Sequence, residues 1–512
     1  GNKIELPRLV KGKKYFIPEN DIEVALLEKD TVQIAFKDGS KEVYKKLKHK
    51  YKIDYILYQK VNTLGFIYDQ SENLTDVVIK SDGTQLGQLG FEYHEKKIYK
   101  IWLIENNSIS RLLALYQYDE NDDLIQATTE NQYNYDYQYK NHLITRYTDL
   151  TGVAMNFEWA TIDDSEKVIH EWMDDGSNEF FFAWDDDIRT TFVKDSLGNT
   201  TEYYYNSNGY TNKVIYPDGS NEIWIRDQAD RIIQHMYPDG SSEKFKYDQH
   251  SNLVEYCDQE DNWTYYQYDE NSNLIFVRDS FGYLWINEYD QSKNLIKAIN
   301  PLKQTTTYQY NALGLPVLIK DAKGGTKALQ YDSNGNLVEY IDCSGKTTKW
   351  SYDKLGRLSV VENALNQRVE YFYTSLTKDQ REPVLKGFPL NAVGELERIK
   401  YADGMEVHFI HDAEGRLLVY IDANQQITKY TYTASGLIQT RTDALNHKLH
   451  YQWDTLSRLK RLINENGAVY EFFYDAVGRL TKEIDFDGNE IKYEYDQNSG
   501  RLATSIEVAS AY

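Results

Sequence analysis

The sequence predicts an all-β protein made of β-hairpin repeats of 21 residues, and three observations support this. An aromatic residue returns at constant spacing: Tyr247, Tyr268, Tyr289, Tyr310, Tyr331 and Tyr352 are each 21 residues apart. Turn-forming Asp, Asn and Gly interrupt the chain about every ten residues. The apolar runs between these turns are short and rich in aromatic and β-branched residues, which favours strands over helices.

The spacing extends well beyond these six tyrosines. The same register covers fifteen positions, of which thirteen are Tyr or Trp, and Asp follows in eleven of them. The two exceptions are Arg226 and His411. The fifteen positions are 184, 205, 226, 247, 268, 289, 310, 331, 352, 373, 411, 432, 453, 474 and 495. A constant period of this length predicts a repeat array, in which each unit packs against its neighbours.

One repeat, from Tyr268 to Tyr289, shows the expected elements in order. Residues 269–272 are polar and predict a turn, and residues 274–277 form an apolar run that predicts a strand. A second turn is expected at 279–282, and a second strand at 283–289. Asp and Asn bond to their own backbone in turns, and Gly adopts positive φ without steric cost. Each repeat is therefore expected to form one hairpin.

The register divides the chain into regions. Residues 1–117 are expected to form an N-terminal β region with weak repeat register, followed by the repeat array over 118–512. Within the array we expect degenerate repeats at 118–183, regular repeats at 184–373, an insertion at 374–410 and regular repeats at 411–512. The insertion predicts a loop, either with a binding role or as a tolerated surface insertion.

The charge balance argues against general binders of polyanions. The chain has 57 Lys and Arg against 80 Asp and Glu, a net charge of −23. Nucleic acids and anionic membranes attract clustered basic residues, so we expect neither as a partner. One basic cluster predicts either a solvated edge strand or a docking patch. It consists of Lys41, Lys45, Lys46, Lys48, Lys50 and Lys52.

The cysteines and the apolar runs indicate neither a disulfide or metal site nor a membrane span. Cys257 and Cys343 are the only cysteines, and they occupy different positions in their repeats, so we expect two free thiols rather than a disulfide or metal cage. No apolar run approaches the length of a membrane span, so none is expected, and no signal peptide is visible.

Several motifs resemble chemical sites. The aspartates that follow the register aromatics recur in so many copies that we interpret them as turn residues. His408 with His411, and His447 with His450, are three residues apart. On a strand such side chains point to opposite faces, so neither pair is expected to bind an ion. We predict no catalytic, cofactor-binding or metal-binding residues, no cofactor and no enzymatic activity.

The register aromatics themselves predict a stacked ladder along the array. Cross-strand packing is one interpretation of this ladder. A face that contacts carbohydrate is the other.

The motif Tyr-Asp-x-x-Gly-Arg-Leu carries a resemblance to a known family. It begins at Tyr352 and again at Tyr474, and a looser copy begins at His411. It resembles the YD-repeat (Rhs) family, which comprises bacterial Rhs polymorphic toxins, the C components of insecticidal toxin complexes, and the animal teneurins. The resemblance is strong over 184–512 and weaker before. It implies a long β-sheet that coils into a hollow cocoon, or part of one, which in the bacterial members encloses a C-terminal toxin.

One family element is missing. The bacterial arrays close with Asp-Pro motifs linked to self-cleavage, but this sequence contains no Asp-Pro dipeptide, and no toxin region follows its last repeat. We therefore expect a shell portion without the protease and without cargo.

The leading hypothesis is a structural one: the shell of a bacterial secreted Rhs-type toxin, which confines a C-terminal toxic domain until delivery. The expected partners are this toxin cargo and spike proteins of a secretion apparatus, with type VI delivery favoured over an insecticidal complex. The acidic charge would retain a basic cargo if it faced inward. The alternative is an extracellular adhesion or carbohydrate-binding array, and an enzyme acting through the 374–410 loop is a third, unsupported by any motif.

Overall fold

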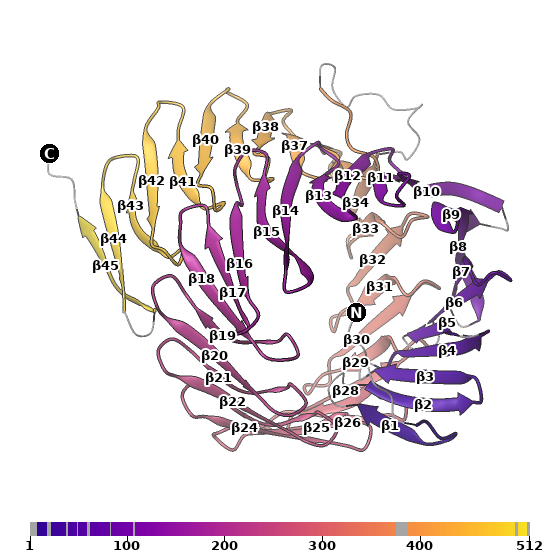
Figure 1. Cartoon of the computed structure of the whole chain (residues 1–512). Coiled ribbons are helices and arrows are strands. Elements are labelled where there is room, and N and C mark those ends of the chain that lie inside the picture. The colour runs from indigo at the N-terminus through magenta and orange to yellow at the C-terminus, as the bar shows by residue number, and fades with distance from the viewer. Residues whose placement is uncertain are drawn as a thin grey trace. The chain divides into compact units, whose positions relative to one another are not determined.

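The computed structural model describes most of the chain, and Figure 1 shows its strands in order. In the described part every regular element is a β-strand; there are 45 of them, assigned to one sheet, and no helix. This confirms the predicted all-β fold. The described residues are 8–17, 22–36, 39–48, 50–58, 62–81, 83–105, 108–374, 388–496 and 500–508.

The N-terminal region forms ten strands, which are up to 11 residues long. They are β1 (Lys14–Ile17), β2 (Ile22–Glu28), β3 (Thr31–Phe36), β4 (Lys41–Leu47), β5 (Lys50–Tyr58), β6 (Asn62–Tyr68), β7 (Leu74–Ser81), β8 (Thr84–His94), β9 (Lys97–Glu105) and β10 (Ser108–Tyr118).

The degenerate repeats follow the N-terminal strands with hairpins of unequal length. Their strands are β11 (Leu124–Thr129), β12 (Asn134–Lys140), β13 (Leu143–Thr148), β14 (Ala154–Ile162) and β15 (Ser165–Met173). Asp163 and Asp164 both have positive φ, as a two-residue hairpin turn requires. Long strands joined by so short a turn explain why the spacing slips between Trp159 and Trp184.

The regular repeats begin at β16 (Phe180–Asp185). The next strands are β17 (Thr190–Asp195), β18 (Thr200–Tyr205), β19 (Thr211–Ile215), β20 (Asn221–Arg226), β21 (Ile232–Met236), β22 (Ser242–Tyr247), β23 (Leu253–Cys257), β24 (Trp263–Tyr268), β25 (Leu274–Arg278), β26 (Leu284–Tyr289), β27 (Leu295–Ile299), β28 (Thr305–Tyr310), β29 (Pro316–Lys320) and β30 (Thr326–Tyr331).

They continue to the C-terminus in the same pattern. The remaining strands are β31 (Leu337–Ile341), β32 (Thr347–Tyr352), β33 (Leu358–Glu362), β34 (Arg368–Tyr373), β35 (Leu396–Lys400), β36 (Glu406–His411), β37 (Leu417–Ile421), β38 (Ile427–Tyr432), β39 (Ile438–Thr442), β40 (Lys448–Trp453), β41 (Leu459–Ile463), β42 (Val469–Tyr474), β43 (Leu480–Ile484), β44 (Glu490–Tyr495) and β45 (Leu502–Val508).

The period of 21 follows from the lengths of these elements. A six-residue strand such as β24 ends on the register aromatic, and a five-residue strand such as β25 follows. We call the five residues after the register aromatic, here 269–273, the first turn. The five residues that close the repeat, here 279–283, are the second turn. Because consecutive strands pair antiparallel, the first and second turns lie at opposite edges of the sheet.

The chain divides into two compact units. The first unit comprises residues 1–115, 226–233 and 243–368, and the second comprises 116–225, 234–242 and 369–512. In the first unit Ile17, Ile22, Val24 and Val32 form a buried cluster. In the second unit Ile410, Val419 and Ile421 are buried together, and Phe388 packs against them. The predicted division at residue 117 stays a prediction, since each unit combines segments that are distant in sequence.

The inserted segment is shorter than the 374–410 expected from the sequence. Strand β35 pairs with β34 so that Tyr373 lies opposite Leu396, as Tyr352 lies opposite Leu358 in a regular repeat. The regular pattern therefore resumes at Leu396. Most of the preceding loop, residues 375–387, lies outside the described residues, so its expected binding role is not tested.

The basic cluster does not lie on an edge strand, and that interpretation was wrong. Strand β4 pairs with β3 on one side and β5 on the other. The lysines occupy the β4–β5 hairpin, where Lys48 donates to the carbonyl of Gln70 at 2.8 Å and Lys52 donates to that of Glu72.

Candidate functional site

The first turns are built around their aspartate. In the repeat that begins at Tyr352, Asp353 Oδ1 accepts hydrogen bonds from the backbone N–H groups of Leu355 and Arg357 at 2.8 and 2.9 Å. Gly356 has a φ of +77°, which an L-residue with a side chain rarely adopts. The same two-bond pattern recurs at Asp248, Asp269, Asp290, Asp332, Asp412, Asp454 and Asp475. The turn role predicted for these residues is confirmed.

The register aromatics are held by a second recurrent bond. The hydroxyl of Tyr352 donates to the carbonyl of Leu337, fifteen residues earlier, at 2.9 Å. Trp453 makes the equivalent bond through Nε1 to Ile438. The same spacing occurs at Tyr68, Trp159, Tyr289, Tyr310, Tyr331, Tyr432, Tyr474 and Tyr495. A half-buried ring with a donor at its tip therefore suits this position, which explains why Tyr and Trp occur there.

Burial also affects the ionisation of these phenols. It raises the pKa of Tyr289, Tyr310, Tyr331 and Tyr352 above the ordinary value. A phenol is protonated at physiological pH even at its ordinary pKa of about 10, so each hydroxyl is available as a donor. The register aromatics are thus held within the sheet by these hydrogen bonds, and their stacking as a ladder stays a prediction.

An arginine at the fifth position of the first turn, which is the arginine of the Gly-Arg-Leu motif in some repeats, joins successive repeats. Arg458 Nε lies 2.7 Å from Asp454 Oδ2 in its own turn. Its guanidinium lies over the ring of Tyr474, 4.9 Å from the centroid. The same arrangement links Arg231 to Tyr247, Arg416 to Tyr432 and Arg479 to Tyr495. This arginine is therefore a local clamp from its own repeat to the next.

In the second unit the sheet also returns to contact itself. First turns of residues 412–501 lie against second turns of residues 149–240, and we call this line of contacts the seam. Thr455 Oγ1 accepts from Ser196 Oγ at 2.5 Å, although the residues are 259 apart in sequence. Its carbonyl accepts from the backbone N–H of Asn178 at 2.8 Å. These turns lie at the ends of strands β15–β18 and β40–β43, which Figure 1 labels.

Charged groups continue the seam in the next two repeats. Arg479 Nη2 donates to Asp218 Oδ2 at 3.2 Å, and Arg501 lies 3.6 Å from Asp239. At the other end, Glu414 accepts from the backbone N–H of Leu150 at 2.9 Å. The contacts of Leu150, Ser196 and Asp218 join residues 264, 259 and 261 apart in sequence. The partners follow the same order along both stretches of the sheet, so the two passes run parallel.

The seam is polar in character. It is made of hydrogen bonds and ion pairs between turn residues, and the carboxylate of Asp239 is held by several donors. The side-chain hydrogen bond from Ser241 is the main cause that lowers the pKa of Asp239, and Arg501 adds to it. Exposed ion pairs are worth little individually. The junction therefore relies on many weak contacts repeated at the same spacing.

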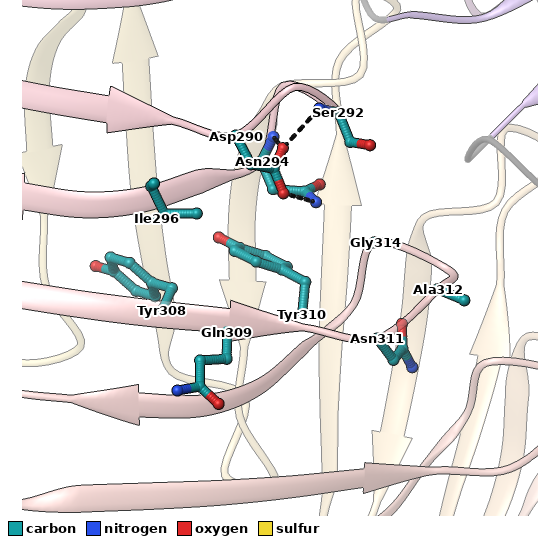
Figure 2. Close-up of a pocket in the computed structure, with 10 residues that line it drawn as sticks. All are labelled: Asp290, Ser292, Asn294, Ile296, Tyr308, Gln309, Tyr310, Asn311, Ala312 and Gly314. Atoms are coloured by element: carbon teal, nitrogen blue, oxygen red, sulfur yellow. Dashed lines mark hydrogen bonds between the residues drawn. The ribbon is translucent and has the colours of Figure 1, made fainter.

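A shallow pocket lies between two consecutive first turns of the first unit, with a volume of about 340 Å³. Figure 2 shows Tyr308 and Tyr310 on one strand facing Ile296 and the turn of Asp290, with Gln309 on the opposite side. Two aromatic rings near amide and carboxylate groups can contact a polar ligand with apolar faces.

The predicted histidine pairs have separate surroundings. His408 lies 3.8 Å from Glu406, whereas His411 Nδ1 lies 3.1 Å from Asn391 Oδ1. Burial lowers the pKa of both imidazoles. His447 contacts Asp443 at 3.2 Å. No group of three or more potential metal ligands occurs in the part of the chain that the structure describes.

The two cysteines are free, as predicted; Cys257 is buried and Cys343 is exposed. No helix among the described residues is long and apolar enough to cross a membrane.

Sequence reasoning missed the seam. One signal was present: two second turns read Pro-Asp-Gly and place Asp218 and Asp239 at the third position of the turn. The arginines that meet them lie more than 260 residues later, and nothing local connects the two.

These features define a β-hairpin repeat protein whose turns form two distinct edges. The Teneurin YD-shell family model matches residues 240–384, and the RHS Repeat model matches residues 453–490. The chain thus contains YD/Rhs repeats over these segments, as the sequence resemblance predicted. No curated protein matches the sequence significantly.

Solved structures of TcdB2-TccC3 have a similar fold. One has a TM-score of 0.53 and 11% identity, and the match covers 100% of this chain and 37% of that chain. A structure of TcdB2-TccC3 without its hypervariable C-terminal region has a TM-score of 0.55 and 10% identity, with 94% and 36% covered. The chain thus spans little more than a third of the length of these solved chains. At this identity the likeness supports the fold alone.

Proposed function

We propose that this chain is a portion of the shell of a bacterial secreted Rhs-type toxin and encloses a C-terminal toxic domain until delivery. The seam is the observation that carries the proposal. A repeat sheet normally leaves both edges open, whereas in the second unit one pass of the sheet is joined along its edge to another. Two stretches of the sheet that are joined turn to turn make a wall wider than a single stretch. Enclosure requires such a wall.

The solved neighbours support the same interpretation. One of them is described as lacking a hypervariable C-terminal region, so in that protein a separable C-terminal part accompanies the shell fold. The corresponding partner here would be a toxin cargo, with secretion-apparatus spike proteins as further partners. Delivery outside the producing cell follows from this role, and the type VI route remains the sequence-based prediction.

The acidic composition would assist retention of a basic cargo. The net charge of −23 creates a negative potential that attracts a cationic domain over about one Debye length, roughly 8 Å at physiological salt. Retention would then weaken as salt increases. Equal retention of a basic cargo at low and high salt would contradict this part of the proposal.

Enclosure is tested by fusing a small reporter domain after Tyr512 and measuring its cleavage by an added protease. We expect the fused reporter to be cut far more slowly than the free reporter, because the wall excludes the protease. The matched control is the same fusion with Arg479→Ala and Arg501→Ala, which removes the charged contacts of the seam to Asp218 and Asp239 and should speed cleavage. A fused reporter that is cut as fast as the free reporter would refute the proposal.

A carbohydrate-binding array is the second candidate, and the pocket at Tyr308 and Tyr310 favours it. Aromatic rings beside amides and a carboxylate suit sugar faces and hydroxyls. A glycan array with the full chain tests it: binding that is lost in Tyr308→Ala supports a carbohydrate site, and the absence of any glycan hit counts against it.

A further inference from the structure

The end of the β4–β5 hairpin concentrates positive charge in an acidic chain. Residues 45–52, which we call the basic hairpin, contain five lysines and no carboxylate, whereas the whole chain has a net charge of −23. Lys45 lies directly opposite Lys52 on the paired strand. Like charges in this arrangement destabilise a sheet, so the local structure alone does not favour lysine here. A docking patch was the other interpretation of this cluster, beside the edge strand that the structure contradicts.

Two of the lysines fix the basic hairpin to the neighbouring hairpin. Lys48 Nζ donates to the carbonyl of Gln70 at 2.8 Å, and Lys52 Nζ donates to the carbonyl of Glu72 at 2.6 Å. The Lys52 ammonium also lies 5.2 Å from the centroid of the Tyr68 ring. Because both ammonium groups bind backbone oxygens of one turn, the basic hairpin is held in place before any partner binds.

The other three lysines have no acidic partner. Lys45, Lys46 and Lys50 are exposed, and none of them lies within ion-pair distance of a carboxylate in the part of the chain that the structure describes. Elsewhere in the first unit Lys246, for example, lies 2.6 Å from Glu255. In a chain with 80 Asp and Glu against 57 Lys and Arg, three neighbouring unpaired lysines indicate a surface for an anionic partner.

These three lysines lie on both faces of the hairpin. The register places Lys45 and Lys50 on one face, and Lys46 with its cross-strand partner Tyr51 on the other, because side chains alternate along a strand. Tyr51 is 45% exposed, so it adds an accessible ring to the second face. A rigid duplex or a flat bilayer meets one face of a hairpin, whereas a flexible chain can contact both.

The net charge also restricts the partner. Nucleic acid and anionic membranes extend beyond the basic hairpin and meet the acidic remainder of the chain, which repels them. A short segment contacts the lysines alone. We propose that the basic hairpin binds a flexible, acidic segment of a partner protein, whose Asp and Glu side chains pair with Lys45, Lys46 and Lys50. At about 0.1 M salt the Debye length is about 10 Å, so the lysines act while more distant carboxylates are screened.

Fluorescence anisotropy of labelled deca-glutamate with the full chain tests the proposal. We expect binding at about 0.1 M sodium chloride that is lost at about 1 M, where the Debye length falls to about 3 Å. The triple variant Lys45→Gln, Lys46→Gln and Lys50→Gln keeps both anchoring lysines, so it should fold. Its binding should be about tenfold weaker, as the loss of three ion pairs implies.

The matched control removes the same charge elsewhere in the first unit. In the variant Lys246→Gln, Lys297→Gln and Lys349→Gln each replaced lysine pairs with a glutamate, and the basic hairpin is unchanged. This control should bind deca-glutamate like the wild type. A wild type that does not bind deca-glutamate at about 0.1 M salt would overturn the proposal, and so would equal binding by the wild type and the basic-hairpin variant.

Three further probes decide the class of partner. A short DNA duplex and phosphatidylserine vesicles should bind far more weakly than deca-glutamate in the same salt, and equal or tighter binding of either would overturn the choice of an acidic polypeptide. Sedimentation velocity tests a second copy of the chain as the occupant. A wild type that stays monomeric while it binds deca-glutamate supports a partner protein. Oligomers that disappear in the basic-hairpin variant would assign the surface to self-association and overturn the proposal.

Discussion

Some second turns of this molecule are covered by first turns at the seam, and others are open to solvent. The two kinds of turn have the same backbone conformation but differ in the residue before the glycine, which forms the tip of the turn. Gly219 lies in a covered turn and Gly282 in an open one, with φ of +84° and +83°. At the position before these glycines the covered turn has Asp218, which meets Arg479, and the open turn has Phe281, which meets solvent. Turn geometry is therefore uniform along the sheet, and the residue at the tip determines what the edge joins.

The largest loss of stability should come from substitutions that disrupt the backbone conformation that both kinds of turn adopt. Gly219→Val and Gly282→Val each force a β-branched residue to positive φ, at a cost of about 1–3 kcal/mol in the free energy of unfolding. Gly488, at φ +86°, should respond likewise. Urea unfolding measures the loss. The Gly219 variant should be the less stable of the first two, because it also displaces the Asp218 contact. A stable Gly282→Val or Gly488→Val protein would contradict the turn assignment.

The next largest loss of stability should come from removing the hydrogen bond of a register aromatic, which covered and open regions both contain. Tyr352→Phe keeps the ring but removes the donor to the carbonyl of Leu337, which should lower the unfolding free energy by about 1 kcal/mol. Tyr283→Phe is the control, because Tyr283 is more than half exposed, and it should change stability little. Equal stability of the wild type and Tyr352→Phe would show that the ladder is held by packing alone.

A smaller loss of stability is expected when a seam contact is removed, and hydrogen exchange should distinguish it from the loss of a local clamp. Arg479→Ala removes the seam contact to Asp218 together with a clamp on Tyr495. Arg231→Ala removes a clamp alone, whose contacts are Asp227, Ser251 and the ring of Tyr247. Each should cost about 0.2–1 kcal/mol. Hydrogen exchange should accelerate in residues 216–220 only in Arg479→Ala. Acceleration there in both variants, or in neither, would contradict the seam contact.

The smallest effect concerns pH. Because its hydrogen bonds lower the pKa of Asp239 in the folded state, this residue stabilises the protein above the unfolded pKa of about 3.9. That contribution is lost as the pH falls through the folded pKa. The protection factor of residues 237–241, which is the exchange rate relative to the intrinsic rate at the same pH, should therefore be constant between about pH 5 and 7 and fall below about pH 4. A fall in protection that begins near neutral pH would point to another group.

Much of the local structure was predictable from the sequence. A period of 21 with Asp and Gly at set offsets determines two strands and two turns per repeat, and the positive φ at Gly356 and Gly488 agrees with that. The N-terminal region was less predictable, because strands of up to 11 residues do not keep the period.

The seam was not predictable because it depends on accumulated geometry. Small twists and bends at each hairpin add over about 260 residues before Thr455 meets Ser196. Local pattern determines each hairpin but not the angle between hairpins. The residues in contact, Ser, Thr, Asn, Asp and Arg, are also ordinary turn residues, so their types carried no signal of a distant partner.

The central claim is that two passes of the sheet are joined along the seam, and disulfide trapping tests it most directly. Ser196→Cys with Thr455→Cys, in a chain with Cys343→Ser, places two thiols where the hydroxyl oxygens are 2.5 Å apart. We predict a rapid disulfide upon mild oxidation. Pairs shifted by one repeat, Ser196→Cys with Ala434→Cys or Ala476→Cys, should not form one. No disulfide in the first pair, or equal yields in all three, would contradict the account.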